Sequence, residues 1–299
     1  MKTGGSLDVG TASGATLAGL AAIGLWGALA LLTTIVGAVP PFQLVAMTFS
    51  LGALVGLVAI LRRGDGIVAA LRWPWRIWAL GVSGLFGFHA LFFAALQLAP
   101  PAEANLVNYL WPLLIVLLSA PLAGTPLRWW HLGGALLGLL GIALLTFGRS
   151  GGLAFAGTYA VGYLCALGSA LAWALYSVLS RRAGEVPSTA VAGFCAATAA
   201  LALVCHLLFE TTRWPASPSA WLSVLALGLG PTGAAFYLWD HAVKRGDIRV
   251  LGALAYLAPL LSTGLLLIFG GATWSFALAL ATLLIVAGAI LAAKDMLWR

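Results

Sequence analysis

The sequence predicts an all-α membrane protein of ten transmembrane helices, arranged as a 5+5 inverted-topology repeat. Three observations support this fold: the composition, the length of the apolar segments and a gapless internal repeat. Of the 299 residues, 62% are hydrophobic and 8% are charged, and the mean hydropathy is +1.06. A soluble domain carries about 25% charged residues. The composition therefore excludes a soluble protein, and membrane orientation explains the net charge of +7 better than nucleic-acid binding does.

Ten apolar segments are each long enough to cross a bilayer, and charges, prolines and glycine-rich breaks delimit them. We expect helices because lipid leaves unpaired backbone groups unsatisfied, and because the alternating ten-residue strands of a membrane barrel are absent. The predicted spans are residues 15–37, 42–61, 77–98, 102–122, 129–147, 159–179, 190–209, 220–239, 250–269 and 274–293.

The basic residues are distributed unequally between the two sides of the membrane. With the N-terminus in the cytoplasm, thirteen of the 15 Lys and Arg residues fall on the inner side, and only Arg149 and Arg213 fall outside. All lie in short loops, where an excess of Lys and Arg marks the cytoplasmic side. We therefore predict that both termini are cytoplasmic.

A shift of 147 residues superimposes the chain on itself without a gap. The matched pairs include Trp26 with Trp173, Pro40 with Pro187, Gly81 with Gly228, Tyr109 with Tyr256, Pro112 with Pro259, Gly124 with Gly271, and Gly141 with Gly288. We predict two five-helix repeats, residues 1–147 and 148–299. Because five is odd, the second repeat enters the membrane from the opposite side. This plan recurs in secondary transporters, whose substrate site lies near the midplane between the halves.

Polar residues form a stripe on the fourth span. Asn105, Asn108, Tyr109 and Pro112 follow helical spacing on one face, and Trp111 borders them. Such a stripe should not face lipid. Pro112 also removes a backbone donor, which leaves the carbonyl of Asn108 without its helical partner.

The ninth span repeats this pattern with Gly252, Tyr256, Pro259 and Thr263, and there the freed carbonyl belongs to Ala255. Kinked packing helices with interhelical hydrogen bonds are the alternative interpretation. The repeat favours a transport site, because proline-interrupted spans at corresponding places in two halves are typical of one.

The third and eighth spans are rich in small residues that permit close helix packing and bending. They carry Gly81, Gly84 and Gly87, and Gly228, Gly230, Pro231 and Gly233, respectively. We predict helix breaks or hinges at Gly84, Pro112, Pro231 and Pro259.

Three tryptophans, Trp26, Trp111 and Trp173, lie too deep in their spans for the interfacial belt where Trp is usually found. Such rings can line a cavity with flat, amphipathic surfaces, although each could instead fill the core between helices. The predicted substrate-binding residues are Trp26, His89, Asn105, Asn108, Tyr109, Trp111, Trp173, Tyr176, Tyr237 and Tyr256.

Few ionisable residues lie inside the spans. His89 is near the middle of the third span, where it is either a functional group or a structural histidine bonded to a neighbouring helix. No Lys or Arg lies mid-span, which argues against phosphorylated substrates. No Asp or Glu does either, since Glu103 and Glu210 lie at outer ends and Asp240 at an inner end. The cavity should therefore suit a small zwitterion or an uncharged metabolite.

The two-copy plan, the tryptophans and prolines above, and the segments NYLWP at 108–112 and AYLAP at 255–259 resemble the EamA-type drug/metabolite transporter superfamily. Within it, NYLWP is similar to the segment of the YddG aromatic amino acid exporters. The resemblance covers nearly the whole chain and implies export across a bacterial inner membrane through a cavity built from spans 1, 3, 4, 6, 8 and 9. It points to His89, Tyr109, Trp111 and Trp173, with Trp26 as the symmetric candidate.

The sequence thus predicts a facilitative exporter of neutral amino acids, aromatic ones included, or similar metabolites, working by alternating access. We expect a small-molecule substrate and the lipid bilayer as partners, no nucleic acid, no obligate protein partner, no cofactor, no metal and no catalytic residue. One alternative is an intramembrane serine protease-like enzyme, because GVSG at 81–84 matches the motif around a rhomboid serine. In a regular helix, however, His89 would lie on the wrong face for Ser83. The other is a proton-coupled exporter of small neutral metabolites, in which His89 could titrate.

Overall fold

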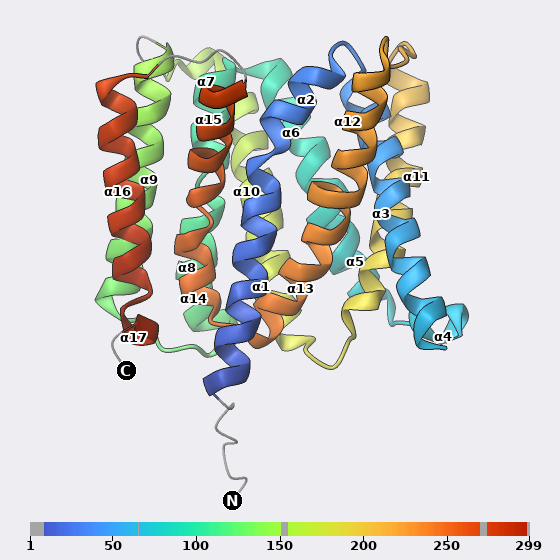
Figure 1. The fold of residues 1–299 in the computed structure, drawn as a ribbon, viewed down its shortest axis with the longest axis horizontal. Coiled ribbons are helices and arrows are strands. Elements are labelled where there is room, and N and C mark those ends of the chain that lie inside the picture. Colours follow the sequence, from blue (N-terminus) through green and yellow to red (C-terminus); the bar gives the residue numbers. More distant parts are fainter. Residues whose placement is uncertain (1–8, 65, 151–154, 270–273, 298–299) are drawn as a thin grey trace, which may run out of the picture.

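The computed structural model describes residues 9–64, 66–150, 155–269 and 274–297, and these residues form helices joined by short connections (Figure 1). The helices of the first half are α1 (Val9–Gly27), α2 (Leu29–Val36), α3 (Pro41–Arg63), α4 (Ile67–Leu71), α5 (Trp75–Val82), η1 (Ser83–Gly87), α6 (Phe88–Leu98), α7 (Pro101–Asn108), α8 (Trp111–Ala123) and α9 (Trp129–Ser150). Those of the second half are η2 (Gly157–Tyr159), α10 (Ala160–Arg182), η3 (Ser188–Ala190), α11 (Val191–Phe209), α12 (Pro218–Leu229), η4 (Gly230–Ala234), α13 (Ala235–Arg245), α14 (Ile248–Leu254), α15 (Leu257–Phe269), α16 (Phe276–Ala292) and α17 (Lys294–Leu297).

Nine helical segments of the described chain are long and apolar enough to cross a membrane, and α16 is a shorter apolar helix of 17 residues. The prediction of an all-helical membrane protein is confirmed. The eighth span is longer than expected, because it runs from Pro218 to Arg245 instead of ending at residue 239. The added turn carries Asp240 and Lys244, which form an ion pair at 2.7 Å along the helix. This pairing allows two charged residues to lie on a buried stretch of helix.

The packing of the helices follows the internal repeat. α1 packs against α13, and their counterparts α10 and α6 also pack together. The pairs α3 with α11 and α9 with α16 each join corresponding spans of the two halves, and they lie at opposite sides of the bundle in Figure 1. The 147-residue shift therefore relates each of these helix contacts to its counterpart or to itself, as expected for two similar halves.

The third and eighth spans each contain a π-helical turn, η1 and η4 respectively. The 147-residue shift superimposes the first and last residues of η1 on those of η4. The predicted breaks at Gly84 and Pro231 fall within them. Side chains from other helices explain the need for glycine, since a methyl group at Gly84 would overlap the Tyr176 side chain. A π-turn adds a residue to the helix and redirects the side chains that follow it.

The fourth span is interrupted where a proline kink was expected, but one turn earlier. α7 ends at Asn108, and α8 begins at Trp111, so that Pro112 lies in the first turn of α8. A proline is well accommodated there, because the amide groups of a first turn have no helical partner. The ninth span breaks in the corresponding place, between α14 and α15.

Both described ends of the chain, at the start of α1 and the end of α17, lie at the same end of the bundle (Figure 1). We call this the terminal end, and the other the opposite end. The connection between α2 and α3 lies at the opposite end (Figure 1).

Candidate functional site

A cavity of about 470 Å³ lies between the two halves, within the range of small-molecule sites. It extends from Trp26 and Trp173 to Val39 and Pro41, in the connection at the opposite end. Its aromatic lining consists of Trp26, Phe88, Phe92, Phe93, Tyr109, Trp111, Trp173 and Phe236. Its other polar side chains are Thr33, Thr48, His89, Asn105, Asn108, Thr232 and Ser262. The described residues that line it include no Asp, Glu, Lys or Arg.

Four indole rings, Trp26, Trp111, Trp173 and Trp239, form a tryptophan cluster at the deep end of this cavity. Each ring contacts the other three, with centroids between 5.1 and 6.4 Å apart. The rings come from α1, α8, α10 and α13, so the cluster joins both halves. Most of these contacts are edge-to-face or tilted, the arrangements that aromatic pairs prefer. Trp26, Trp111 and Trp173 line the cavity and form its floor, and the buried Trp239 packs against them.

Two indole N–H groups of this cluster are used within the protein. Trp26 Nε1 donates to the carbonyl of Pro231 at 3.0 Å, and Trp239 Nε1 donates to Ser177 Oγ at 3.0 Å. Within the described chain, no hydrogen bond engages the N–H of Trp111 or Trp173. Trp111 and Trp173 both line the cavity, so their two donors are available to a bound molecule.

The imidazole of His89 is held in one orientation at the cavity wall. Its Nδ1 lies 2.7 Å from the carbonyl of Leu85, within the π-turn η1. A carbonyl only accepts, so Nδ1 must carry the proton, and in the neutral ring Nε2 is then an acceptor. The rings of Phe49 and Phe88 pack edge-on against it at 5.2 and 5.1 Å. His89 can therefore offer an acceptor to a bound molecule.

The predicted polar face of the fourth span does line the cavity. Asn108 is buried, and its Oδ1 accepts a hydrogen bond from Ser169 Oγ at 3.0 Å. This bond directs the carboxamide, leaving the Nδ2 amino group as its other polar atom. Asn105 lies nearer the opposite end and donates to the carbonyl of Pro101 at 2.8 Å. Tyr109 completes this part of the lining.

Three predicted site residues, Tyr176, Tyr237 and Tyr256, are not among the described residues that line the cavity. Each ring packs against a glycine of another span instead, at Gly84, Gly56 and Gly138, respectively. Their hydroxyl groups are also engaged elsewhere, since Tyr237 donates to the carbonyl of Gly52 and Tyr256 to that of Tyr109. These tyrosines support the helices that form the cavity.

Sequence reasoning missed Trp239 and the phenylalanine face of α6. The face was detectable, because Phe88, Phe92 and Leu96 follow four-residue spacing. Trp239 was harder to detect because the predicted span ends at that residue.

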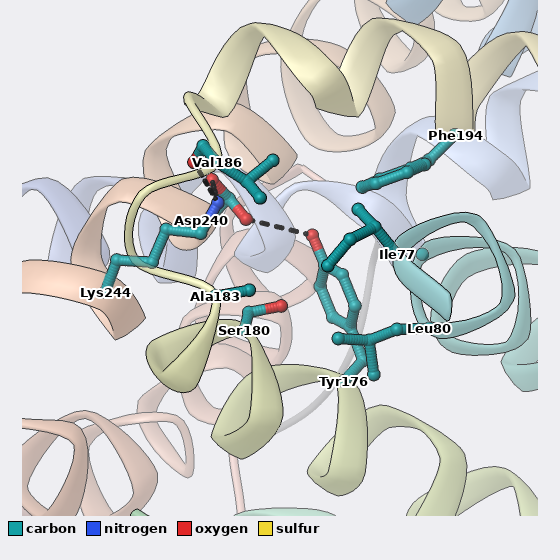
Figure 2. Close-up of a pocket in the computed structure, with 10 residues that line it drawn as sticks. Ile77, Leu80, Tyr176, Ser180, Ala183, Val186, Phe194, Asp240 and Lys244 are labelled. Atoms are coloured by element: carbon teal, nitrogen blue, oxygen red, sulfur yellow. Dashed lines mark hydrogen bonds and ion pairs between the residues drawn. The ribbon is translucent and has the colours of Figure 1, made fainter. Parts of the chain in front are cut away.

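A narrow crevice lies beyond the tryptophan cluster, toward the terminal end. It has a volume of about 10 Å³ and is lined by Tyr176, Asp240 and Lys244 among others (Figure 2). This is the least volume that can hold one water molecule.

Polar contacts tie the helices together at the terminal end. The guanidinium of Arg181 donates to the carbonyls of Val243 and Gly246, at 3.1 and 2.7 Å. The backbone N–H of Asp247 donates to Thr16 Oγ1 at 3.0 Å, which fastens α1 to the connection before α14. These contacts hold the helices together at the terminal end, whereas the cavity extends toward the opposite end.

The model of the EamA-like transporter family matches residues 12–147 and 160–294, once in each half. The chain belongs to this family. An aromatic amino acid exporter, YddG of Ancylobacter novellus, is 56% identical over 280 residues, covering 94% of this chain and 97% of that protein. The YddG of Salmonella typhimurium is 26% identical over 298 residues, covering 94% and 97% of the two chains. A solved crystal structure, 55% identical, superimposes with a TM-score of 0.91 and covers 96% of this chain and 99% of the other.

Membership of a transporter family decides between the carrier and the enzyme alternatives: the chain is a transporter. The serine of the GVSG segment fits this result. Ser83 is exposed and its hydroxyl donates to the carbonyl of Leu80 at 3.2 Å, while His89 Nδ1 is bound to Leu85. Neither arrangement forms a nucleophile and base pair.

Proposed function

We propose that this EamA-like transporter exports neutral amino acids, aromatic ones above all, from the cytoplasm across a bacterial inner membrane. The observation that carries the proposal is the uncharged cavity above the tryptophan cluster, taken with the 56% identity to a protein named as an aromatic amino acid exporter. Aromatic walls stabilise an apolar or aromatic side chain by burial and edge-to-face contact. The absence of charge among the described lining residues disfavours phosphorylated and strongly cationic substrates.

The polar atoms of the cavity suit the two charges of an amino acid zwitterion. Asn108 Nδ2 and the indole N–H groups of Trp111 and Trp173 can donate to a carboxylate. His89 Nε2 can accept from an ammonium group, which aromatic faces also attract. The cavity thus supplies donors and acceptors without a fixed ion.

The transport cycle we propose is alternating access between two inverted repeats, residues 1–147 and 148–299. The exchange of helix contacts under the 147-residue shift supports this topology, as does its recurrence among secondary transporters. The π-turns at Gly84 and Pro231 and the breaks before Pro112 and Pro259 serve as hinges. Cytoplasmic termini are supported by the excess of basic residues on that side, and this orientation makes the described conformation outward-open.

Purified protein in liposomes tests this function. Labelled phenylalanine should enter protein-containing vesicles faster than empty ones, and tyrosine, tryptophan and methionine should compete. Phenethylamine, which lacks the carboxylate, should compete poorly. Equal uptake by empty and protein-containing vesicles for all neutral amino acids would refute the proposal.

The same vesicles separate facilitated from proton-coupled export. We propose that the substrate gradient alone drives the flux, because the described cavity lining contains no carboxylate to carry a proton. A pH gradient imposed at fixed phenylalanine should then change the initial rate by less than twofold. A steep response would favour proton coupling instead.

A further inference from the structure

A buried ion pair lies in the crevice at the terminal end. Lys244 Nζ donates to Asp240 Oδ2 at 2.7 Å and to the carbonyl of Val186 at 2.9 Å. The Tyr176 hydroxyl lies 3.5 Å from the other carboxylate oxygen (Figure 2). The side chains of Asp240 and Lys244 are only 1% and 7% exposed. These contacts join α10, α13 and the connection before α11.

The internal repeat relates this crevice to the cavity. A shift of 147 residues places five crevice residues on residues that line the cavity: Leu80 on Leu227, Tyr176 on Leu29, Ser180 on Thr33, Val186 on Val39, and Asp240 on Phe93. Deep in the cavity, the same shift instead exchanges lining residues with each other, Trp26 with Trp173 and His89 with Phe236. The crevice is thus the counterpart, at the terminal end, of the space that is open at the opposite end.

The two counterparts differ in charge. Asp240 and Lys244 correspond to Phe93 and Gln97 of the first repeat, and neither of these can form an ion pair. The terminal end therefore carries a buried ion pair where the opposite end has uncharged residues at the corresponding positions.

We propose that the crevice is the collapsed cytoplasmic access route to the cavity. Its gate is the buried Asp240–Lys244 pair of α13, which holds the route closed through its contacts with Val186 and Tyr176. Each charge is stabilised in the closed state by its partner, and both would be hydrated in the open state. Removing one partner leaves the other charge buried and uncompensated, which penalises the closed state. This inference rests on the alternating access of the proposed function.

Thiol labelling at two corresponding positions tests the gate. Ser180→Cys places a thiol in the crevice, and Thr33→Cys places one at its counterpart in the cavity. A bulky, water-soluble maleimide is applied to the purified full-length protein, and the reaction of the parent chain, with its three natural cysteines, is subtracted. We expect S180C to be protected and T33C to react.

The gate is then opened by Lys244→Met or Asp240→Asn. Either change should raise the labelling rate of S180C at least tenfold and lower that of T33C, because the two routes open in alternation. The double variant removes both charges and should give a smaller rise than either single variant. Lys294→Met, an exposed lysine at the same end, is the matched control and should change neither rate.

Two results would overturn the proposal that the Asp240–Lys244 pair is a gate. One is an unchanged rate for S180C in both single variants. The other is a rise at both positions, which indicates general loosening of the fold. The labelling needs no amino acid, so phenylalanine export measured separately distinguishes failure of the gate from failure of the proposed function.

Discussion

At the scale of single residues, substrate recognition depends on which polar groups the protein leaves unused. The N–H groups of Trp26 and Trp239 are bound to Pro231 and Ser177, so these rings are held by the protein itself. Trp111 and Trp173 also line the cavity, and no hydrogen bond within the described chain engages their N–H groups, so we expect these donors to bind a ligand. Similar tryptophans therefore have different roles, and those roles can be separated by substitution.

Trp111→Phe keeps an aromatic ring in the floor and removes only the indole donor. A hydrogen bond to a charged group contributes about 1.5 to 3 kcal/mol, so we expect the KM for phenylalanine to rise roughly tenfold or more. Trp111→Ala, which also removes the ring, should abolish measurable transport. Initial rates in proteoliposomes check this, with Trp129→Phe as a control at an exposed position. An unchanged KM in Trp111→Phe would show that the indole N–H does not bind substrate.

Asn108 should recognise the carboxylate because Ser169 holds its carbonyl oxygen. Asn108→Leu has nearly the same shape and should raise the KM for phenylalanine about tenfold, the equivalent of about 1.4 kcal/mol. Phenylalaninamide, which lacks the negative charge, should inhibit wild type and variant with affinities within twofold of each other. Ser169→Ala should raise the KM for phenylalanine by a smaller factor and should likewise leave inhibition by phenylalaninamide nearly unchanged. Equal losses for both compounds would mean that Asn108 only shapes the cavity.

At the scale of helices, the breaks in the spans position the site. The π-turn η1 supplies the carbonyl that orients His89, and its counterpart η4 contains the carbonyl that accepts from Trp26. Both turns depend on residues that allow close packing. Their equal spacing in the two halves indicates that the break belongs to the repeated unit.

Gly84 and Gly87 provide a matched comparison within one π-turn. A methyl group at Gly84 would overlap Tyr176, whereas one at Gly87 would meet only Ser83 Cβ at 3.8 Å, an ordinary contact. Gly84→Ala should therefore lower stability by about 1 to 3 kcal/mol and reduce transport, while Gly87→Ala should change stability by less than about 1 kcal/mol. Thermal unfolding in detergent measures both. Equal effects would argue against close packing at Gly84.

We expect the stability of the fold to depend on pH through Asp247, which lies in the connection between α13 and α14. Burial alone would raise the pKa of its carboxyl, but the hydrogen bonds and charge of Arg249 outweigh burial and hold that pKa below its ordinary value. The ionised form thus stabilises the fold above the unfolded pKa of about 3.9, and the stabilisation is lost as the pH falls through the lower folded value.

Asp247→Asn keeps a helix-capping side chain and removes the charge. The free energy of unfolding of the wild type should exceed that of the variant by roughly 1 to 2 kcal/mol at pH 7. This difference should shrink below about pH 4. Melting temperatures at pH 7, 5 and 3 test this. A difference that stays constant with pH would contradict the assignment.

Several elements were predictable because their signals are local. Arg62 and Arg63 mark where a helix leaves the bilayer, and Pro41 and Pro218 lie in the first turns of α3 and α12. The polar face of Asn105 and Asn108 was predictable from helical spacing.

What remained hidden depends on tertiary contacts. The eighth helix continues past residue 239 to Arg245 and includes the Asp240–Lys244 pair, so Trp239 lies within the helix, and its ring is buried. Tyr176 turns away from the cavity because it packs on Gly84 of another span. Neither contact is visible in the spacing of residues along one helix.

At the scale of the whole molecule, the two ends of the bundle differ. Hydrogen bonds join the helices at the terminal end, beyond the tryptophan cluster, while the cavity extends to the connection between α2 and α3. The proposed inverted repeat predicts a second arrangement in which the ends exchange roles. We therefore expect one binding site that is exposed alternately to each side of the membrane.

Counterflow in proteoliposomes tests whether one site alternates between the two sides. Vesicles loaded with unlabelled phenylalanine are diluted into a trace of labelled phenylalanine with no pH or voltage gradient. We predict that label accumulates transiently above its equilibrium level, since an alternating site returns loaded with unlabelled substrate, and that Trp111→Ala shows no such overshoot. A rise to equilibrium without overshoot, or uptake equal to that of empty vesicles, would contradict the account.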